Sequence, residues 1–259
     1  MKTTALITGA ASGIGKEFSR IHASKGGNIV AVDMNAEGLK SLKSELEKEH
    51  GIEVYIIVKN LTQLSAPKEI YDEVKNQGIE VNYLINNAGF GGVGAFHERD
   101  WDIDLAMIQV NVLALTALTR QFLPDFIARD SGKILNVSST VSLIPGPFQA
   151  VYFATKAFVT SFNRSIHGEL SDTNVSSTAV LPGATKTAFG DHSGMNKTAI
   201  YKKPASAAEV ALQGYNAMEK GEVEVIAGLN FNQRLELKLV PFLSAKSLIN
   251  RIKKESAVN

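Results

Sequence analysis

The hydrophobic positions of this chain form short runs that recur along most of its length. Most of these runs are nearly continuous rather than alternating with polar residues, which is typical of strands in a parallel sheet covered on both faces. Predicted strands lie at Thr4–Thr8, Asn28–Asp33, Glu53–Val58, Asn82–Asn86, Lys133–Val137, Ser176–Leu181 and Glu222–Ile226.

Stretches with helical character separate the predicted strands. They lie at about Gly13–Lys25, Glu37–His50, Ala66–Asn76, Trp101–Arg129, Ala150–Leu170 and Ala207–Lys220. Regular alternation of strands and helices favours an α/β fold with a doubly wound parallel sheet, the Rossmann fold. The sequence has no internal repeat, low-complexity segment or interdomain linker, so we expect a single domain over residues 1–259.

Two segments depart from this regular pattern. Residues 184–204 show no clear period, and about twenty residues without structure in a compact domain are typical of a lid or a mobile loop. Residues 231–259 form a C-terminal amphipathic extension in which lysines and arginines interleave with apolar residues, interrupted by Pro241. We favour packing of this extension over the substrate mouth or on a partner subunit, with peripheral membrane contact as the alternative.

Composition and charge narrow the class of protein. The chain has 259 residues, 44% of them apolar, and a formal net charge of +1, which gives no indication of a nucleic-acid partner. Because it has no cysteine, disulfides and thiolate metal sites are excluded, and we expect no metal. We find no signal peptide and no apolar stretch approaching the ~20 residues of a membrane span. The expectation is a soluble cytoplasmic protein.

A glycine-rich segment joins the first predicted strand to the first helix. It reads Thr8-Gly9-Ala10-Ala11-Ser12-Gly13-Ile14-Gly15, with the spacing Gly-x3-Gly-x-Gly. Glycines permit a tight turn and let backbone N–H groups approach a pyrophosphate, while the helix N-terminus adds partial positive charge. Asp33 ends the second strand about twenty residues later, where an acid can bind ribose hydroxyls. Together these features predict a dinucleotide site rather than a plain strand–helix turn.

Two other patterns imitate ligand motifs. Gly89–Gly94 matches Gly-x-Gly-x-x-Gly literally, but no helix starts at its third glycine and no acid ends a strand about twenty residues later. We interpret it as a flexible loop at the mouth of the site. Asp100, Asp102 and Asp104 have the spacing that opens a calcium loop, but positions 105 and 111 lack the required glycine and glutamate. We interpret these acids as residues near a helix N-terminus.

A serine, a tyrosine and a lysine form the candidate catalytic group. Tyr152 and Lys156 are four residues apart in a predicted helix and share one face, although such a pair alone is common on surfaces. Ser139 stands just past a strand end, thirteen residues before Tyr152, and parallel strands direct their carboxyl ends at the ligand crevice. The three side chains can therefore meet beside a cofactor.

The chemistry of these residue types suits proton transfer. A tyrosine hydroxyl has a reference pKa of about 10, which a nearby ammonium lowers by favouring the phenolate. The phenol can then protonate a ketone oxygen as hydride arrives, or deprotonate an alcohol as hydride leaves. The serine hydroxyl can hold and polarise the same oxygen.

With these residues in view, the sequence resembles the short-chain dehydrogenase/reductase family from Thr4 to about Ile226. Within it, the chain is similar to a bacterial branch of uncharacterised oxidoreductases related to hydroxysteroid and ketoacyl reductases. The matching residues are Thr8-Gly-x3-Gly-Ile-Gly15, Asn86-Asn87-Ala88-Gly89, Asn111, Ser139, Tyr152-x3-Lys156, and Pro182-Gly183 with Thr187. The resemblance implies an NAD(P)-dependent oxidoreductase that acts on CH–OH groups.

The resemblance also implies a role for each matching residue. Asn111 would hold a water that links Lys156 to solvent, and Lys156 would also bind the nicotinamide ribose. The stretch Asn86–Gly89, which includes Asn87 and Ala88, would line the cofactor beneath the adenine ribose and steady the central sheet. On the nicotinamide side, the remaining cofactor contacts would come from Tyr152, Pro182, Gly183 and Thr187. On the adenine side they would come from Asn60 and Leu61, at positions where the family usually has Asp-Leu or Asp-Val. Helices near Asp102–Arg129 and Ala150–Leu170 would pair in a homodimer or homotetramer.

Residues around the second strand favour NAD(H) over NADP(H). The carboxylate of Asp33 would repel a 2′-phosphate, and neither Met34 nor Ser12 brings a compensating positive charge. Lys16 and Lys40 leave a rescue by a mobile lysine open, so an NADP-dependent ketone reductase is the alternative.

The expected substrate is a lipophilic secondary alcohol or ketone. Candidate pocket residues are Phe90, Val93, Phe96, Val141, Leu143, Ile144, Phe148 and Phe189. Lys186 in the predicted lid is the one cation that could clamp an anionic substrate. A non-catalytic nucleotide-sensing protein on the same fold is the rival interpretation, because a fold does not fix a function. Sugar epimerases and dehydratases share Tyr-x3-Lys, but they usually have another glycine spacing and a longer C-terminal domain.

Overall fold

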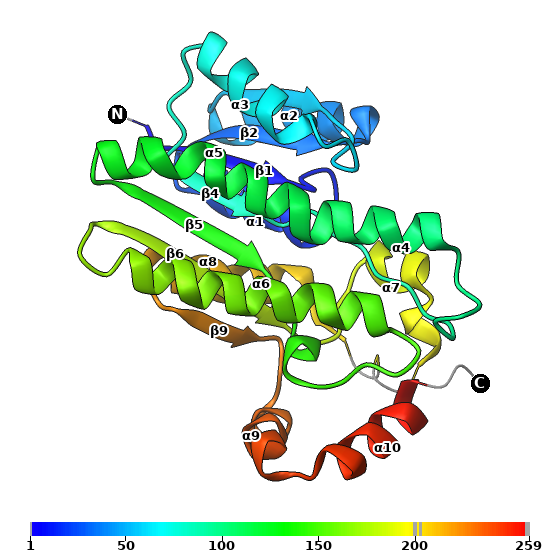
Figure 1. The fold of residues 1–259 in the computed structure, drawn as a ribbon. Coiled ribbons are helices and arrows are strands. Elements are labelled where there is room, and N and C mark those ends of the chain that lie inside the picture. Colours follow the sequence, from blue (N-terminus) through cyan, green and yellow to red (C-terminus); the bar gives the residue numbers. More distant parts are fainter. Residues whose placement is uncertain (1, 199–200, 202–203, 257–259) are drawn as a thin grey trace.

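A seven-stranded parallel sheet forms the centre of the computed structural model, which describes residues 2–198, 201 and 204–256 (Figure 1). The strand order is β3-β2-β1-β4-β5-β6-β9. The strands are β1 (Thr4–Thr8), β2 (Asn28–Asp33), β3 (Val54–Val58), β4 (Tyr83–Asn86), β5 (Gly132–Val137), β6 (Val175–Pro182) and β9 (Glu224–Ala227). The order reverses between β1 and β4, and ligands of such sheets bind at this point, outside the carboxyl ends of the strands.

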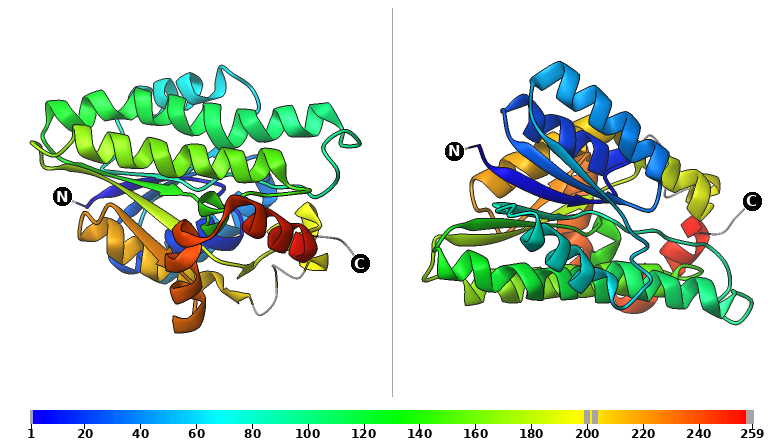
Figure 2. Two further views of the ribbon diagram at one scale, coloured as in Figure 1. Left: turned by 60° about the horizontal axis from the view of Figure 1, so that its bottom comes forward. Right: turned by 90° about the horizontal axis from the view of Figure 1, so that it is seen from above.

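Helices cover both faces of the sheet (Figure 2). They are α1 (Gly13–Ser24), α2 (Ala36–His50), α3 (Ala66–Asn76), α4 (Trp101–Ile108), the π-helix η1 (Gln109–Ala114), α5 (Leu115–Ala128), α6 (Ala150–Glu169) and α8 (Ala207–Glu219). Apolar side chains of α1, α2 and α8 form the core on one face, while those of α3 and α5 form most of the core on the other. The prediction of a doubly wound Rossmann fold is confirmed.

Strand β1 shows why the apolar runs are continuous. Ala5 and Ile7 belong to the core on one face of the sheet, and Leu6 belongs to the core on the other. All three side chains are fully buried. A strand between two helical layers has no polar face, so its sequence does not alternate.

The predicted helix at Trp101–Arg129 contains a π-helical turn. The chain passes from α4 through η1 into α5 without leaving the helix. π-Helical turns inside α-helices often occur at functional sites. Here the turn contains Asn111, whose side chain is buried.

The same helix contradicts the expectation that no apolar stretch approaches the length of a membrane span. Trp101–Ala128 is long and apolar enough to cross a membrane by length and composition, with a mean hydropathy of 1.4 in its most apolar window. Core helices pass the same test. This one buries Phe122 and Phe126 completely against the sheet, which is the packing of a core helix.

The predicted lid contains short regular elements, so the expectation that it lacks structure is wrong for the described part. Its elements are β7 (Thr185–Lys186), α7 (Ala188–Ser193) and the 3₁₀ turn η3 (Met195–Lys197). β7 pairs in parallel with β8 (Ala205–Ser206). Elements this short give no detectable period in a sequence. Residues 199–200 and 202–203 of the predicted lid lie outside the described residues.

The C-terminal extension forms two helices that stand at one edge of the molecule (Figure 1). They are α9 (Phe231–Leu239) and α10 (Ala245–Ser256), joined through a 3₁₀ turn, η5 (Val240–Phe242). Asn230 caps α9 by accepting a hydrogen bond from the backbone N–H of Gln233 at 3.0 Å. Residues 257–259 lie outside the described part of the chain.

Candidate active site

A cleft of about 860 Å³ lies at the carboxyl ends of the central strands. It is lined by residues that follow β1, β2, β3, β4, β5 and β6, so segments distant in sequence converge there. Of the predicted cofactor and catalytic residues, only Gly15 and Asn111 are absent from its lining.

The glycine loop between β1 and α1 forms one end of this cleft. Gly9 and Gly13 adopt positive φ angles of 66° and 54°, which side chains disfavour. Gly15 lies beneath the loop: a Cβ there would stand 2.2 Å from the carbonyl oxygen of Gly9. Gly15 thus allows α1 to approach β1 closely, which explains why it does not line the cleft.

Thr8 fixes the loop to the end of β4. Its hydroxyl oxygen accepts hydrogen bonds from the backbone N–H groups of Asn87 and Ala88, both at 3.0 Å. The Asn87 amide donates in return to the carbonyl oxygen of Thr8 at 2.9 Å. Sequence reasoning placed Thr8 in the motif but gave it no role. The threonine joins the two halves of the predicted dinucleotide site.

The carboxylate of Asp33 faces the glycine loop. One oxygen accepts from the backbone N–H of Ala11 at 3.1 Å, and the other accepts from that of Asn35 at 2.9 Å. Asp33 and the exposed Met34 both line the cleft. The structure therefore holds a negative charge at the predicted ribose position.

The lysines near this position are paired with glutamates. Lys16 forms an ion pair with Glu45 at 3.0 Å, and Lys40 forms one with Glu37 at 2.8 Å. Lys59, which sequence reasoning missed, also lines the cleft and pairs with Glu69 at 2.7 Å. It follows the end of β3, and its position beside the cleft depends on the sheet order.

Ser139, Tyr152 and Lys156 all line the same cleft and are buried. Ser139 caps the 3₁₀ turn η2 (Thr140–Leu143), and its hydroxyl donates to the carbonyl oxygen of Pro182 at 3.3 Å. The Lys156 ammonium donates to the carbonyl oxygen of Val137 at 2.8 Å. The predicted catalytic group is thus brought together at the carboxyl ends of β5 and β6.

Burial dominates the electrostatics of this group. Desolvation raises the pKa of Tyr152 above its ordinary value, although a hydrogen bond with Ser139 acts in the opposite direction. Burial lowers the pKa of Lys156 to about 8. The expectation of a lowered pKa for this phenol is not met, because desolvation of the phenolate is the largest effect on it. Tyr152 is therefore a protonated phenol at neutral pH.

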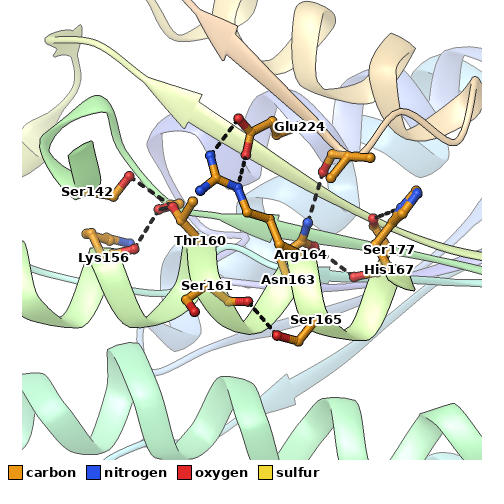
Figure 3. Close-up of polar contacts among 12 residues, drawn as sticks. Ser142, Lys156, Thr160, Ser161, Asn163, Arg164, Ser165, His167, Ser177 and Glu224 are labelled. Atoms are coloured by element: carbon orange, nitrogen blue, oxygen red, sulfur yellow. Dashed lines mark hydrogen bonds and ion pairs between the residues drawn. The ribbon is translucent and has the colours of Figure 1, made fainter. Parts of the chain in front are cut away.

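Polar contacts fix the helix that carries Tyr152 and Lys156 (Figure 3). The Ser138 hydroxyl donates to the carbonyl oxygen of Lys156 at 2.9 Å. Further along α6, the Asn163 amide donates to the carbonyl oxygen of Val223 at 2.9 Å. Arg164 donates to both carboxylate oxygens of Glu224 at 2.8 Å. These bonds hold α6 against the end of β5 and the start of β9. They thereby fix the position of α6 relative to the cleft.

Asn111 lies behind the cleft wall. Its amide nitrogen donates to the carbonyl oxygen of Phe90 at 2.9 Å and to the Thr155 hydroxyl at 3.0 Å, while its amide oxygen accepts from the backbone N–H of Phe90 at 3.1 Å. A Cβ on Gly89 would stand 2.9 Å from the Asn111 oxygen and 3.4 Å from the Lys156 nitrogen. Asn111 thus positions the loop after β4, and it is not part of the cleft lining.

An ion pair anchors a different loop, Gly89–Gly94, which follows β4. Arg99 donates to Asp104 at 2.6 Å and 2.8 Å and to the carbonyl oxygen of Val93 at 3.0 Å. Asp104 is only 1% exposed. The sequence placed this acid near a helix N-terminus, where it lies, but gave no sign of its burial or of its partner. Phe90 and Gly91 of the anchored loop line the cleft.

The substrate end of the cleft differs in part from the predicted pocket. Phe90, Val141, Ile144 and Phe189 line it. The other four predicted residues, Val93, Phe96, Leu143 and Phe148, do not. Sequence reasoning missed apolar lining residues from the predicted lid, from the loop between β9 and α9 and from the C-terminal extension, namely Met195, Tyr201, Leu229, Leu237, Val240, Leu248 and Ile252.

The charged groups at this end also differ from expectation. Lys186 is exposed and is not part of the lining. Arg251 is part of it, but it pairs with Glu236 at 3.1 Å and with Glu255 at 2.9 Å. Across residues 2–198, 201 and 204–256, no cluster of three histidines or acids could hold a metal ion.

Comparison with known proteins agrees with this geometry. The protein-family model described as "short chain dehydrogenase" matches residues 3–197 of this chain. The chain belongs to the short chain dehydrogenase family. Its predicted membership is confirmed, and its relatives are named as dehydrogenases and reductases.

Two relatives and one solved structure illustrate the similarity. The chain is 33% identical over 226 residues to the 3-oxoacyl-[acyl-carrier-protein] reductase FabG of Thermotoga maritima, covering 86% of each protein. It is 30% identical over 188 residues to the very-long-chain 3-oxoacyl-CoA reductase of Anas platyrhynchos, covering 69% of this chain but only 58% of that one. A short-chain dehydrogenase from Sphingobium yanoikuyae in complex with NADPH superposes with a TM-score of 0.83 at 27% identity, covering 99% of this chain and 98% of that one.

Family membership supports a nicotinamide cofactor in the cleft of this short chain dehydrogenase. It also supports the predicted relationship to ketoacyl reductases.

Proposed function

We propose that this short chain dehydrogenase is an oxidoreductase that transfers hydride between NAD(H) and a lipophilic secondary alcohol or ketone. The observation that carries the proposal is the shared cleft: Ser139, Tyr152 and Lys156 line one part, and the glycine loop with Asp33 lines another. A protein that only sensed a nucleotide would have no need for a buried serine, tyrosine and lysine beside its nucleotide site.

The residues of the cleft fit a nicotinamide dinucleotide. The loop at Gly9 and Gly13 has no side chain where a pyrophosphate would approach, and Ser12 precedes α1 with no capping bond from its hydroxyl. Asp33 would hold the adenosine ribose, Lys156 the nicotinamide ribose, and the stretch from Pro182 to Thr187 the nicotinamide side. The bound cofactor would supply or accept the hydride.

The chain's own residues would move the proton. The buried Tyr152 keeps its phenolic proton at neutral pH and would donate it to the ketone oxygen during reduction. The Ser139 hydroxyl would hold the same oxygen. The Lys156 ammonium would stabilise the phenolate that remains, since an opposite charge favours the ionised form. In the reverse direction the phenolate would take a proton from the alcohol.

The preference for NAD(H) rests on the surroundings of Asp33. Its carboxylate faces the glycine loop, and Lys16, Lys40 and Lys59 are each paired with a glutamate. Among the residues that the structure describes, these pairings leave Asp33 without an unpaired lysine beside it, so a 2′-phosphate would meet a negative charge. At about 4 Å and an effective dielectric of about 20, two unit charges interact by roughly 4 kcal/mol.

The lining of the substrate end supports a lipophilic substrate. Phe90, Val141, Ile144 and Phe189 come from the main domain, and Leu248 and Ile252 come from α10. In this proposal the predicted lid and the C-terminal extension cover the substrate, as the sequence pattern suggested. Arg251 at this end is paired with two carboxylates, which argues against a small anionic substrate.

We also propose a homodimer or homotetramer and a cytoplasmic location. Leu105, Leu113, Ile127 and Phe158 are large apolar side chains exposed on the helices expected to pair. Burying them in a subunit interface would remove apolar surface from water. Light scattering of the purified chain tests this part.

A substrate screen tests the proposed function. The purified protein is incubated with NADH or NADPH and a panel of ketones, graded from small keto acids to bulky lipophilic ketones, while absorbance of the reduced nicotinamide is followed. We expect turnover with the lipophilic ketones and NADH. Binding of NADH without turnover of any ketone would instead support a nucleotide sensor. Turnover of small keto acids alone would contradict the substrate class.

A further inference from the structure

The C-terminal extension carries two apolar faces, and only one of them serves the cleft. The inner face contributes Leu237, Val240, Leu248 and Ile252 to the cleft lining. Leu248 and Ile252, four residues apart on α10, are buried in a cluster that also contains Tyr152. Packing over the cleft therefore accounts for these four apolar side chains.

A second set of large apolar side chains in the same extension points into solvent. Their exposed fractions range from 41% for Ile249 to 84% for Phe242. The set consists of Phe231, Leu235, Leu239, Phe242, Leu243 and Ile249. Phe231, Leu235 and Leu239 are spaced by four residues and form one stripe along α9. Contiguous exposed apolar surface of this kind marks an interaction site.

Positive charge accompanies the exposed apolar side chains. Residues 231–259 hold six basic and two acidic residues, a formal charge of +4 on a chain whose total is +1. Lys246 and Lys253 lie three residues before and four residues after the exposed Ile249, so they share its face of α10. Lys246, Lys253 and Lys254 are exposed and form no ion pair with another residue of the described chain.

We propose that this outer face docks on an anionic lipid bilayer. Apolar side chains would enter the interface between headgroups and acyl chains, and the lysines would contact the anionic headgroups. The helices that would touch the bilayer also line the substrate end of the cleft. A lipophilic substrate dissolved in the bilayer would thus reach the cleft without passing through water. This last step rests on the proposed function, but the docking itself does not.

Charge argues for lipid rather than a second copy of the chain. Two outer faces brought together would oppose net positive charge to net positive charge, and like charges across an interface disfavour association. An anionic surface has the opposite sign. The exposed set also contains large aromatic and aliphatic side chains, which suit the apolar depth of an interface.

Vesicle sedimentation with the full chain tests the proposal. The vesicles consist of phosphatidylcholine alone or of phosphatidylcholine with phosphatidylglycerol. We expect the wild type to sediment with the anionic vesicles at least about tenfold more than with the neutral ones, with the difference shrinking at high salt. Phe231→Ser/Phe242→Ser should lose at least about tenfold in partitioning, because apolar burial in the bilayer is lost.

Two further variants serve as controls. Leu64→Ser removes an apolar side chain that is 72% exposed just before α3, on a part of the molecule distant from α9 in Figure 1. It should sediment like the wild type. Lys246→Glu/Lys253→Glu should lose the preference for anionic vesicles, and thermal melting checks that each variant is folded.

Three results would overturn the proposal. One is a wild type that does not sediment with anionic vesicles, and another is equal sedimentation of the wild type and Phe231→Ser/Phe242→Ser. The third is an oligomer, seen by light scattering, that only Phe231→Ser/Phe242→Ser dissociates, since a second copy would then cover this face. None of these readouts depends on turnover, so failure of the proposed function is seen separately in the substrate screen.

Discussion

The Lys156 ammonium nitrogen lies 6.0 Å from the centre of the Tyr152 ring. The two side chains are one helical turn apart on α6, and both are buried. At this separation and burial, the phenol of Tyr152 keeps a raised pKa, while that of the lysine falls to about 8. At the start of the proposed reduction, Tyr152 is therefore a protonated acid, and Lys156 is a cation whose lowered pKa brings it close to deprotonation.

Tyr152→Phe should remove turnover and leave cofactor binding intact. The phenylalanine keeps the ring that packs near Phe153 and Phe189 but has no proton to donate. Positioned proton transfer contributes about 10²–10⁴-fold, so we expect at least about a hundredfold loss in kcat. Initial rates and NADH fluorescence titration measure the two quantities. A variant with near wild-type turnover would exclude Tyr152 as the proton donor.

Ketone reduction should slow as the pH rises through about 8. Below that pH both Tyr152 and Lys156 hold their protons, so the rate should change little. Above it Lys156 becomes neutral and no longer stabilises the phenolate, and the rate should fall by up to about tenfold per pH unit. A profile of kcat against pH at saturating ketone and NADH checks this. A rate that rises through this range contradicts the assigned protonation states.

Asp33→Asn should weaken the preference for NAD(H). The wild type should favour NAD(H) by at least about tenfold in kcat/KM, which corresponds to ~1.4 kcal/mol of the repulsion between Asp33 and a 2′-phosphate. Asparagine removes the charge but keeps an oxygen that can accept a hydrogen bond from the backbone N–H of Ala11 or Asn35. The ratio of kcat/KM values with the two cofactors should fall by about tenfold.

Lys59→Met is the matched test of the same site. If Lys59 stays in its ion pair with Glu69, the substitution should change the ratio of kcat/KM values with the two cofactors by less than about threefold. A wild type that prefers NADP(H), with the preference lost in Lys59→Met, would show that Lys59 leaves Glu69 to bind the 2′-phosphate. In that case the assignment of NAD(H) is wrong.

Asp104→Asn should destabilise the protein. It leaves Arg99 nearly buried without its carboxylate partner, and removal of one member of a buried ion pair commonly lowers the free energy of unfolding by about 3–5 kcal/mol. Urea unfolding measures this quantity. Asp102→Asn, at an exposed position two residues earlier, should change it by less than about 0.5 kcal/mol. Equal effects of the two substitutions would mean that the Arg99–Asp104 pair does not anchor the loop.

Local patterns in the sequence determined the elements and much of the site. Strand β1 follows from an uninterrupted apolar run, because a strand covered on both faces has no polar side. The glycine loop, Asp33 and the Tyr152–Lys156 pair follow from spacing within one strand–helix unit or one helix. The structure brings these residues to a single cleft because parallel strands end at the same edge of the sheet.

Contacts between distant segments depended on the tertiary structure. Lys59 lines the cleft only because β3 lies beside β2 at the edge of the sheet. The pKa of Tyr152 depends on burial, to which residues from α7 and α10 contribute, and no sequence spacing measures desolvation. The C-terminal extension showed its amphipathic pattern in the sequence. Only its packing revealed which apolar side chains face the cleft and which remain exposed, since one helical pattern fits either arrangement.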